Sequence, residues 1–287
     1  MTWGVSVINN SGVAGEHVLR QLICHLVLIL GTVFMLGPIV LIVMSSSHDT
    51  STLQLHGLQW VPGNHTLQNY GSLFAFEAGF SGSATVSSML VNSFIVATGV
   101  GLVTTIVSWC AASVLVFFKW RWAGALFWLT FVTLLFPLES RFVNTFPIVV
   151  QLGLINTHAG MILPVLPMAL ATLFFRQYFK SMPVELQEAA MLDGTGPVKF
   201  LRDFVLPLSI ARASAVFVVA FVIGWNQYLW PTMISTDDSM YTLIRGVRFV
   251  GQESGPGMAF AFITMLPPLV LVLLLQKHIF RAFSLFD

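Results

Sequence analysis

The sequence predicts an all-α integral membrane protein with six transmembrane helices. Only 9% of the 287 residues are charged, against about 25% in a typical soluble domain. Hydrophobic residues make up 56%, which is more apolar surface than one soluble core of this size can hide. These residues form long runs near the roughly 20 residues that cross a bilayer, not the alternating segments of membrane β-barrels.

Each long apolar run is interpreted as one span. We expect the first span at residues 22–44, because this run is too long for the apolar part of a signal peptide and lacks a small-residue cleavage site. A polar cluster from Ser45 to Asp49 follows it. The other spans are predicted at residues 87–116, 123–142, 160–179, 213–234 and 257–276.

The distribution of Lys and Arg predicts the orientation, because cytoplasmic connections of membrane proteins are enriched in these residues. With both termini cytoplasmic, only Arg141, Arg245 and Arg248 lie outside. The inner set is Arg20, Lys119, Arg121, Arg176, Lys180, Lys199, Arg202, Arg212, Lys277 and Arg281. We therefore expect a cytoplasmic N-terminal segment (1–20), a lipid-embedded transmembrane domain (21–280) and a cytoplasmic tail (281–287).

The composition also disfavours several classes of function. A net charge of +1 provides no overall field for binding nucleic acid. Cys24 and Cys110 lie inside apolar runs, so a disulfide scaffold is not expected. The histidines show no metal-ligand spacing, and no GxxxxGK[ST] loop for ATP phosphates occurs. We expect no catalytic residue, no metal and no cofactor in this chain.

The connection between the fourth and fifth spans, residues 181–207, is the most informative segment. Pro183 suits the first turn of a helix, and Gly194 supplies the left-handed position that commonly ends one. Pro197 opens a second short helix that Pro207 is expected to stop. Two short helices around a glycine elbow are typical of a docking element, although an amphipathic hairpin lying on the membrane surface fits the pattern equally well.

One set of residues in this connection resembles the EAA loop of ABC-importer permeases: Glu188, Ala189, Ala190, Asp193, Gly194, Phe200 and Pro207. Thr195 stands where that family usually has alanine. The resemblance implies the MetI-like fold of type I importers. It also implies that the loop docks into a cleft of an ATPase subunit, with Glu188 making a charged contact and Gly194 permitting the tight elbow.

The same resemblance implies the partners of the chain. A second homologous permease would complete the solute path, and an extracytoplasmic binding protein would deliver the solute. A homodimeric ATPase would bind ATP and Mg and hydrolyse the ATP, so the chain itself would not be an enzyme. Its place would be the bacterial cytoplasmic (inner) membrane, as a multi-pass protein.

Further segments resemble the carbohydrate-importer permeases of the MalG type and, among them, the UgpE-type subfamily that serves glycerol-3-phosphate import: residues 138–142, 152–157, 174–179 and 224–231. This likeness implies import of sn-glycerol-3-phosphate or of glycerophosphodiesters such as glycerophosphocholine. A maltose- or trehalose-type sugar permease is the alternative. A secondary transporter, an alternative of another class, is disfavoured because the acidic residues lie in loops or near span ends.

Candidates for the solute path lie near the ends of the third and fifth spans. A guanidinium binds phosphate bidentately, so Arg141 is a candidate for an anionic solute, with a membrane-anchoring arginine as the alternative. Glu139 is two residues away and would point elsewhere on a helix, and Pro137 is expected to kink the helix and open this end. Asn226 and Tyr228, with Trp225, form the second candidate group, for which an aromatic belt is the alternative.

Overall fold

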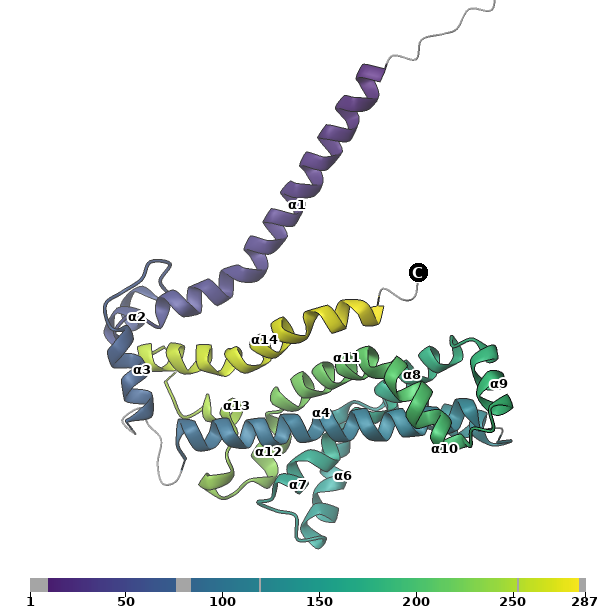
Figure 1. Cartoon of the computed structure of the whole chain (residues 1–287). Coiled ribbons are helices and arrows are strands. Elements are labelled where there is room, and N and C mark those ends of the chain that lie inside the picture. Colours follow the sequence, from purple (N-terminus) through teal and green to yellow (C-terminus); the bar gives the residue numbers. More distant parts are fainter. Residues whose placement is uncertain (1–9, 76–83, 119, 252, 284–287) are drawn as a thin grey trace, which may run out of the picture.

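The computed structural model describes residues 10–75, 84–118, 120–251 and 253–283, and within these ranges it contains helices and no strand (Figure 1). The prediction of an all-α protein is therefore confirmed. Lys119 and the outermost parts of the predicted terminal segments, residues 1–9 and 284–287, lie outside the described residues.

The α-helices and intervening turns are α1 (Asn10–Ser45), α2 (Thr50–His56), α3 (Thr66–Phe74), α4 (Val86–Phe117), α5 (Ala123–Val132), a 3-10 turn (Thr133–Leu135), α6 (Leu138–Gln151), α7 (His158–Ile162), a 3-10 turn (Leu163–Val165), α8 (Met168–Lys180), α9 (Val184–Leu192), α10 (Pro197–Phe200), a π-helical turn (Leu201–Val205), α11 (Leu206–Trp225), α12 (Leu229–Ile234), a 3-10 turn (Asp238–Met240), α13 (Leu243–Gly246) and α14 (Gly255–Phe283).

Four stretches of the described chain are long and apolar enough to cross a membrane as continuous helices: Leu19–Ser45, Val86–Phe117, Pro197–Trp225 and Gly255–Phe280. Two further pairs of helices pass the same test only when each bent pair is counted as one span. The described residues therefore provide four to six candidate spans.

The second span agrees with its predicted bounds to within one residue at each end. Its start is fixed by a capping box at Thr85, whose hydroxyl accepts the Ser88 N–H at 2.9 Å while the Ser88 hydroxyl accepts the Thr85 N–H at 3.0 Å. These bonds satisfy two of the free donors at a helix start. The first helix, in contrast, begins at Asn10, well before the apolar run that predicted it.

The third and fourth predicted spans are not single helices, which corrects the sequence interpretation. The third bends by 104° between Ala123–Leu135 and Glu139–Gln151, and the fourth bends by 54° between His158–Val165 and Met168–Lys180. Both breaks fall at a residue before proline, Phe136 and Leu166, with extended backbone. A proline ring disfavours helical backbone in the preceding residue, so each apolar run is divided there.

The fifth predicted span, residues 213–234, is also divided. Helix α11 ends at Trp225 and α12 begins at Leu229. Pro231 has no N–H to bond to the Gln227 carbonyl, and it lies in the first turn of α12, where a helix needs no such donor. The residues 226–228, predicted to lie inside a span, instead form its interruption.

Helices α8 and α11 both pack against α4, and α14 covers α11 and also touches α1 and α3 (Figure 1). The contact between α4 and α11 uses glycine: a Cβ built on Gly224 would lie 2.8 Å from the Val100 Cβ. Small residues allow helix backbones to approach closely in membranes. The α2–α3 hairpin and the α9–α10 segment lie at opposite ends of this bundle, and α1 rises away from it.

Candidate functional site

The segment formed by α9 and α10, together with the π-helical turn after them, contains the residues predicted to dock on a partner. Helix α9 ends in a Schellman motif, in which the Thr195 N–H donates to the Ala190 carbonyl and the Gly194 N–H donates to the Met191 carbonyl, both at 3.0 Å. Gly194 has φ of 68°, the left-handed conformation that the sequence predicts here. The elbow is therefore built by the glycine and two backbone hydrogen bonds.

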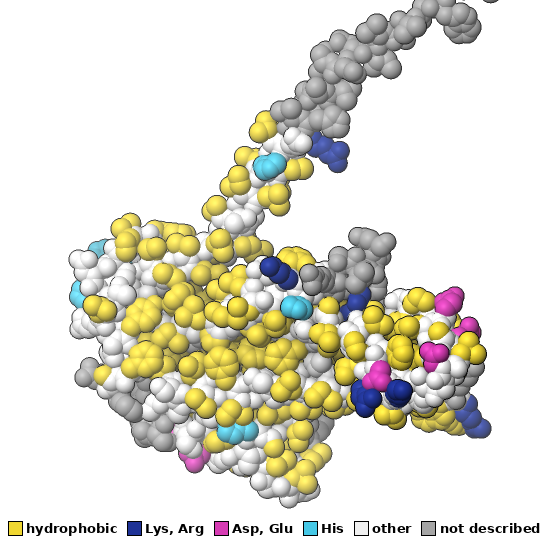
Figure 2. Space-filling model, in the orientation of Figure 1, with side chains coloured by type: hydrophobic (Ala, Val, Ile, Leu, Met, Phe, Trp, Pro, Cys, Tyr) yellow, Lys and Arg dark blue, Asp and Glu magenta, His cyan; other side chains and the backbone are white. Residues whose placement is uncertain are grey.

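Helix α9 buries one face and exposes the other. Ala190 is buried in a cluster that includes Phe179 and Phe200. Glu188, Ala189 and Asp193 are exposed. Exposed apolar side chains flank this acidic surface: Val184, Met191, Leu192 and Val198. Figure 2 shows charged side chains gathered around the α9–α10 end, beyond the apolar middle of the molecule. An exposed face that mixes apolar and acidic groups can bind a protein partner.

Phe200 holds the segment on the helix bundle. It is 5% exposed and meets Phe117 of α4 edge to face, with ring centroids 5.4 Å apart. Phe117 in turn lies 5.4 Å from Phe179, in the last turn of α8. Edge-to-face pairs of this kind add to the free energy of burial. The sequence analysis did not single out Phe117, although its place at the end of an apolar run was visible.

Pro207 does not stop the second docking helix, which corrects the prediction. The chain runs from Pro197 through a π-helical turn directly into α11, and Pro207 lies exposed in the first turn of that helix. The Leu206 N–H donates to the Leu201 carbonyl, five residues back. This wider turn accommodates the proline, whose ring would clash with the carbonyl four residues earlier in a regular α-helix. Helix α10, the π-helical turn and α11 therefore form one continuous helical stretch.

Arg141 and Glu139 both lie exposed at the start of α6. Arg141 lines a pocket of about 260 Å³. Thr130, Thr133 and Pro167, which lies at the helix break before α8, also line it. Within the described residues its guanidinium has no ion pair, since the ion pair found there joins Arg202 to Asp203. The hydroxyls of the two threonines donate to the Leu126 and Thr130 carbonyls at 2.9 and 2.7 Å, so the guanidinium is the free polar group that Arg141 brings to this pocket.

The second group of candidates is divided by burial. Asn226 is exposed at the end of α11, where its amide donates to the Val222 carbonyl at 2.9 Å, and Tyr228 is 40% exposed. Trp225 is 2% exposed, and its indole N–H donates to the Thr264 carbonyl of α14 at 3.1 Å. The structure therefore places Trp225 between α11 and α14, while Asn226 and Tyr228 remain accessible to a solute.

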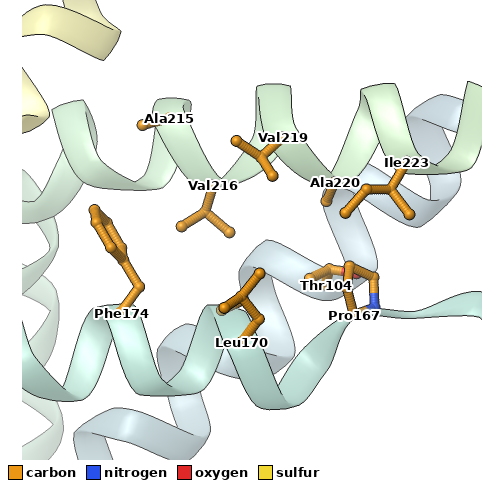
Figure 3. Close-up of a pocket in the computed structure, with 10 residues that line it drawn as sticks. Thr104, Pro167, Leu170, Phe174, Ala215, Val216, Val219, Ala220 and Ile223 are labelled. Carbon is orange, nitrogen blue, oxygen red and sulfur yellow. The ribbon is translucent and has the colours of Figure 1, made fainter. Parts of the chain in front are cut away.

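A cavity that the sequence did not predict lies between α4, α8 and α11 (Figure 3). It has a volume of about 190 Å³ and apolar walls, with Leu170 and Phe174 on one side and Val219 and Ile223 on the other. Thr104 contributes a buried hydroxyl that has no hydrogen-bond partner among the described residues. The cavity offers little polar recognition, because a single hydroxyl is its main polar group.

The long apolar helices define the chain as a multi-pass membrane protein. Residues 101–285 match the family described as "Binding-protein-dependent transport system inner membrane component". The chain belongs to this family, whose description is of a transport component and not of an enzyme.

The curated relatives agree with this assignment. The chain is 37% identical over 268 residues to the sn-glycerol-3-phosphate transport system permease protein UgpE of Yersinia pestis bv. Antiqua (strain Antiqua), covering 91% of this chain and 95% of that protein. It is 38% identical over 273 residues to UgpE of Brucella melitensis biotype 1, with the same coverage. The resemblance to UgpE-type permeases is thereby confirmed at the level of family.

Among solved structures, the chain is similar to one from the crystal structure of a bacterial ABC transporter involved in the import of the acidic polysaccharide alginate. The TM-score is 0.74 at 18% sequence identity, and the match covers 96% of this chain and 99% of the other. This similarity shows the fold, which is the MetI-like fold of ABC-importer permeases.

Proposed function

We propose that this chain is one of two homologous permease subunits of an ATP-driven importer in the bacterial cytoplasmic membrane. The solute we infer is sn-glycerol-3-phosphate or a glycerophosphodiester such as glycerophosphocholine. The UgpE relatives, which align over nine-tenths of the chain, support this solute class. The single observation that carries the importer mechanism is the docking segment, with its glycine elbow and its exposed acidic face.

In this proposal the exposed face of α9 binds a homodimeric ATPase. Glu188 makes the charged contact, and the apolar side chains of Met191 and Leu192 bury against the partner. A charge pair at a desolvated interface is costly to break, by about 2–5 kcal/mol. ATP and Mg bind to the ATPase, and this chain hydrolyses nothing.

The second permease accounts for the unburied apolar surface of the chain. The most apolar window of α1, within Leu19–Ser45, has none of its residues buried inside the chain. In a membrane such a surface packs against lipid or another apolar helix. We infer that the two permeases face each other across the solute path and that an extracytoplasmic binding protein delivers solute to them.

Closure of the two ATPases would then move the docked helices and turn the path from inward- to outward-facing. Rigid-body rotation of packed helices about an interface is an established form of switching. The continuous helix from Pro197 to Trp225 supports this mechanism, because displacement at its docking end is carried into the bundle.

The solute path would contain Arg141, Glu139, Asn226 and Tyr228, with Trp225 supporting the last two from within the bundle. The guanidinium of Arg141, which lines the pocket of about 260 Å³ and has no ion pair among the described residues, suits a phosphate group. A bidentate pair with phosphate combines charge with directional hydrogen bonds. A neutral hexose would have no need of that cation.

The test is solute-stimulated ATPase activity of the complex reconstituted with its partners. Stimulation by glycerol-3-phosphate or glycerophosphocholine, but not by maltose, supports the proposal. Stimulation by maltose alone supports a maltose- or trehalose-type permease instead. Solute uptake that proceeds without the ATPase supports a secondary transporter.

A further inference from the structure

We propose that Tyr178 and Arg212 form a brace between the last turn of α8 and the first turns of α11. These two places, where the chain enters and leaves the docking segment, are called its roots. The brace makes α8 and α11 move as one body when that segment is displaced. This inference rests on the proposed function, because it concerns how ATP hydrolysis is coupled to transport. Arg212 and Tyr178 act as positioning residues, at a distance from solute and nucleotide.

The brace consists of contacts between the last turn of α8 and the first turns of α11. The Arg212 guanidinium carbon lies 3.9 Å from the centroid of the Tyr178 ring. The Tyr178 hydroxyl donates to the Leu208 carbonyl at 2.9 Å, and Nη1 of Arg212 is 3.5 Å from the same oxygen. Ring, guanidinium and carbonyl therefore interlock across the two helices.

The electrostatics of Arg212 are unusual for a residue that only fills space. Its side chain is 6% exposed and lies inside the candidate span Pro197–Trp225. No carboxylate within the described residues pairs with it, and its Nε is buried without a hydrogen-bond partner. A buried cation without a carboxylate partner is costly, which indicates a task beyond filling space. An apolar side chain of similar length would fill the position without that cost. The contact with the Tyr178 ring is the main electrostatic support of the Arg212 charge.

The location of the pair gives that task. The chain leaves the bundle at the end of α8, at Lys180, and α9 begins at Val184. It returns through α10 and the π-helical turn directly into α11. A pull on α9 therefore acts on both roots. If the roots could separate, the displacement would be absorbed between them; because Tyr178 and Arg212 join them, the helices are displaced together.

A neighbouring contact attaches the same turn of α11 to α4. The indole N–H of Trp109 donates to the hydroxyl of Ser209 at 2.7 Å. Trp109 also meets Phe179, the residue after Tyr178, edge to face at 6.0 Å. The brace is thus backed by α4, the central helix of the bundle, and motion of the roots reaches it directly.

The experiment measures solute transported per ATP hydrolysed by the complete complex in proteoliposomes. Arg212→Met removes the charge and keeps the length, and Tyr178→Leu removes the ring. We expect both variants to assemble and hydrolyse ATP, while solute moved per ATP falls about fivefold or more, the lower end of measured coupling between sites. A loss of packing alone would lower the amount of complex without changing this ratio.

Matched variants separate the brace from general stability. Tyr178→Phe keeps the ring under the guanidinium but loses the hydrogen bond to Leu208, so its ratio should lie between those of the wild type and Tyr178→Leu. Arg212→Lys keeps the charge and should recover part of the ratio. Phe127→Leu removes a different stacked pair, in which Arg176 lies 3.8 Å over the Phe127 ring. That pair joins α8 to α5 and not the two roots, so the solute moved per ATP should not change in the Phe127→Leu complex.

The brace is wrong if assembled Arg212→Met and Tyr178→Leu complexes transport as much solute per ATP as the wild type, or if Phe127→Leu loses coupling equally. Should Arg212→Met fail to assemble, Tyr178→Leu and Arg212→Lys decide the matter by the same ratio. A wild-type complex without any solute-stimulated hydrolysis contradicts the proposed function. A coupled wild type with equally coupled variants contradicts only the brace.

Discussion

Asn156 and Thr236 are joined by two reciprocal hydrogen bonds: the Asn156 amide donates to the Thr236 hydroxyl at 2.8 Å, and the Thr236 N–H donates to Asn156 Oδ1 at 2.7 Å. The same oxygen accepts the Asp237 N–H at 3.0 Å. Asn156 has φ of 56°, a left-handed conformation that asparagine tolerates better than most residues. One side chain therefore ties the turn after α6 to the segment after α12.

Replacing Asn156 should separate the contribution of its side-chain hydrogen bonds from that of its left-handed backbone conformation. We expect Asn156→Ala to lower the free energy of unfolding by about 2–3 kcal/mol, from lost hydrogen bonds and left-handed strain. Asn156→Gly keeps the backbone conformation and should lose only about 1–2 kcal/mol. Denaturant unfolding of the purified chain measures both. Equal losses in the two variants would show that backbone strain contributes nothing.

Gly224 should be intolerant of a larger side chain. A Cβ there would lie 2.8 Å from the Val100 Cβ and 3.2 Å from the Ala97 Cα, so Gly224→Ala should cost about 1–3 kcal/mol by overpacking. The double variant Val100→Ala/Gly224→Ala should regain part of this loss in a thermal unfolding assay. Gly124→Ala, whose Cβ would meet nothing within 4 Å, is the control and should be neutral or slightly stabilising.

Removing the docking contacts should release the ATPase. In a co-purification assay, Glu188→Ala combined with Gly194→Pro should lower the amount of bound ATPase at least about tenfold, because the charged contact and the elbow are both lost. Glu185→Ala removes an exposed acidic residue from the first turn of the same helix and should leave binding intact. If the double variant retains full association and transport, the docking assignment is wrong.

The sequence predicted long uninterrupted helices better than it predicted their breaks. The second span came within one residue because the charge-free run of residues 78–118 contains the whole helix, whose start within that run is fixed by the capping box at Thr85. The kink expected at Pro137 agrees with the break at Phe136. The bend at Leu166 was missed because apolar periodicity does not report where a helix changes direction, although a proline follows there too. The Gly194 elbow was predictable, since left-handed backbone is a local property.

Contacts between distant segments could not be predicted in this way. The indole of Trp225 was a candidate for the solute path, but its burial depends on α14, which follows much later in the chain. Arg212 was read only as one of the cations that set orientation. Its proximity to Tyr178 follows from how α8 and α11 pack, and the visible signal was a lone cation shortly after Pro207, inside an apolar run.

Acid should loosen the connection after α1. Asp49 caps α2, accepting hydrogen bonds from the hydroxyls of Ser51 and Thr52 and from the Thr52 N–H. These bonds hold the pKa of the Asp49 carboxyl well below its usual range. The stabilisation is therefore present above the unfolded-state pKa, near 4, and is lost as pH falls through the lower folded-state value. The protection factors of the α2 amides, which are their exchange rates relative to unstructured amides at the same pH, should fall in acid.

Asp49→Asn provides the control for this pH effect. Asparagine also caps helices but does not titrate, so in this variant the protection factors of the α2 amides should not fall in acid. An unchanged pH dependence in this variant would assign the effect to another group.

Arg141 should discriminate between solutes that carry phosphate and those that do not. Arg141→Ala should lower uptake of glycerol-3-phosphate about tenfold or more, the loss expected for a charged bidentate contact. Arg141→Lys keeps the charge without the planar guanidinium, so its uptake should lie between those of the wild type and Arg141→Ala. Arg248→Ala removes another exposed cation and is the control. Unchanged uptake in both Arg141 variants would remove this residue from the solute path.

The π-helical turn at Leu201–Val205 has a further consequence for the docking segment. Its hydrogen bond reaches back five residues from Leu206 to Leu201, so the turn contains one residue more than a regular α-helix would. Each residue of an α-helix corresponds to a rotation of about 100°. Deleting one residue here would restore the regular turn and rotate everything before it about the axis of α11 by that angle. A single residue therefore sets the rotational phase in which Glu188 faces away from the membrane-spanning helices.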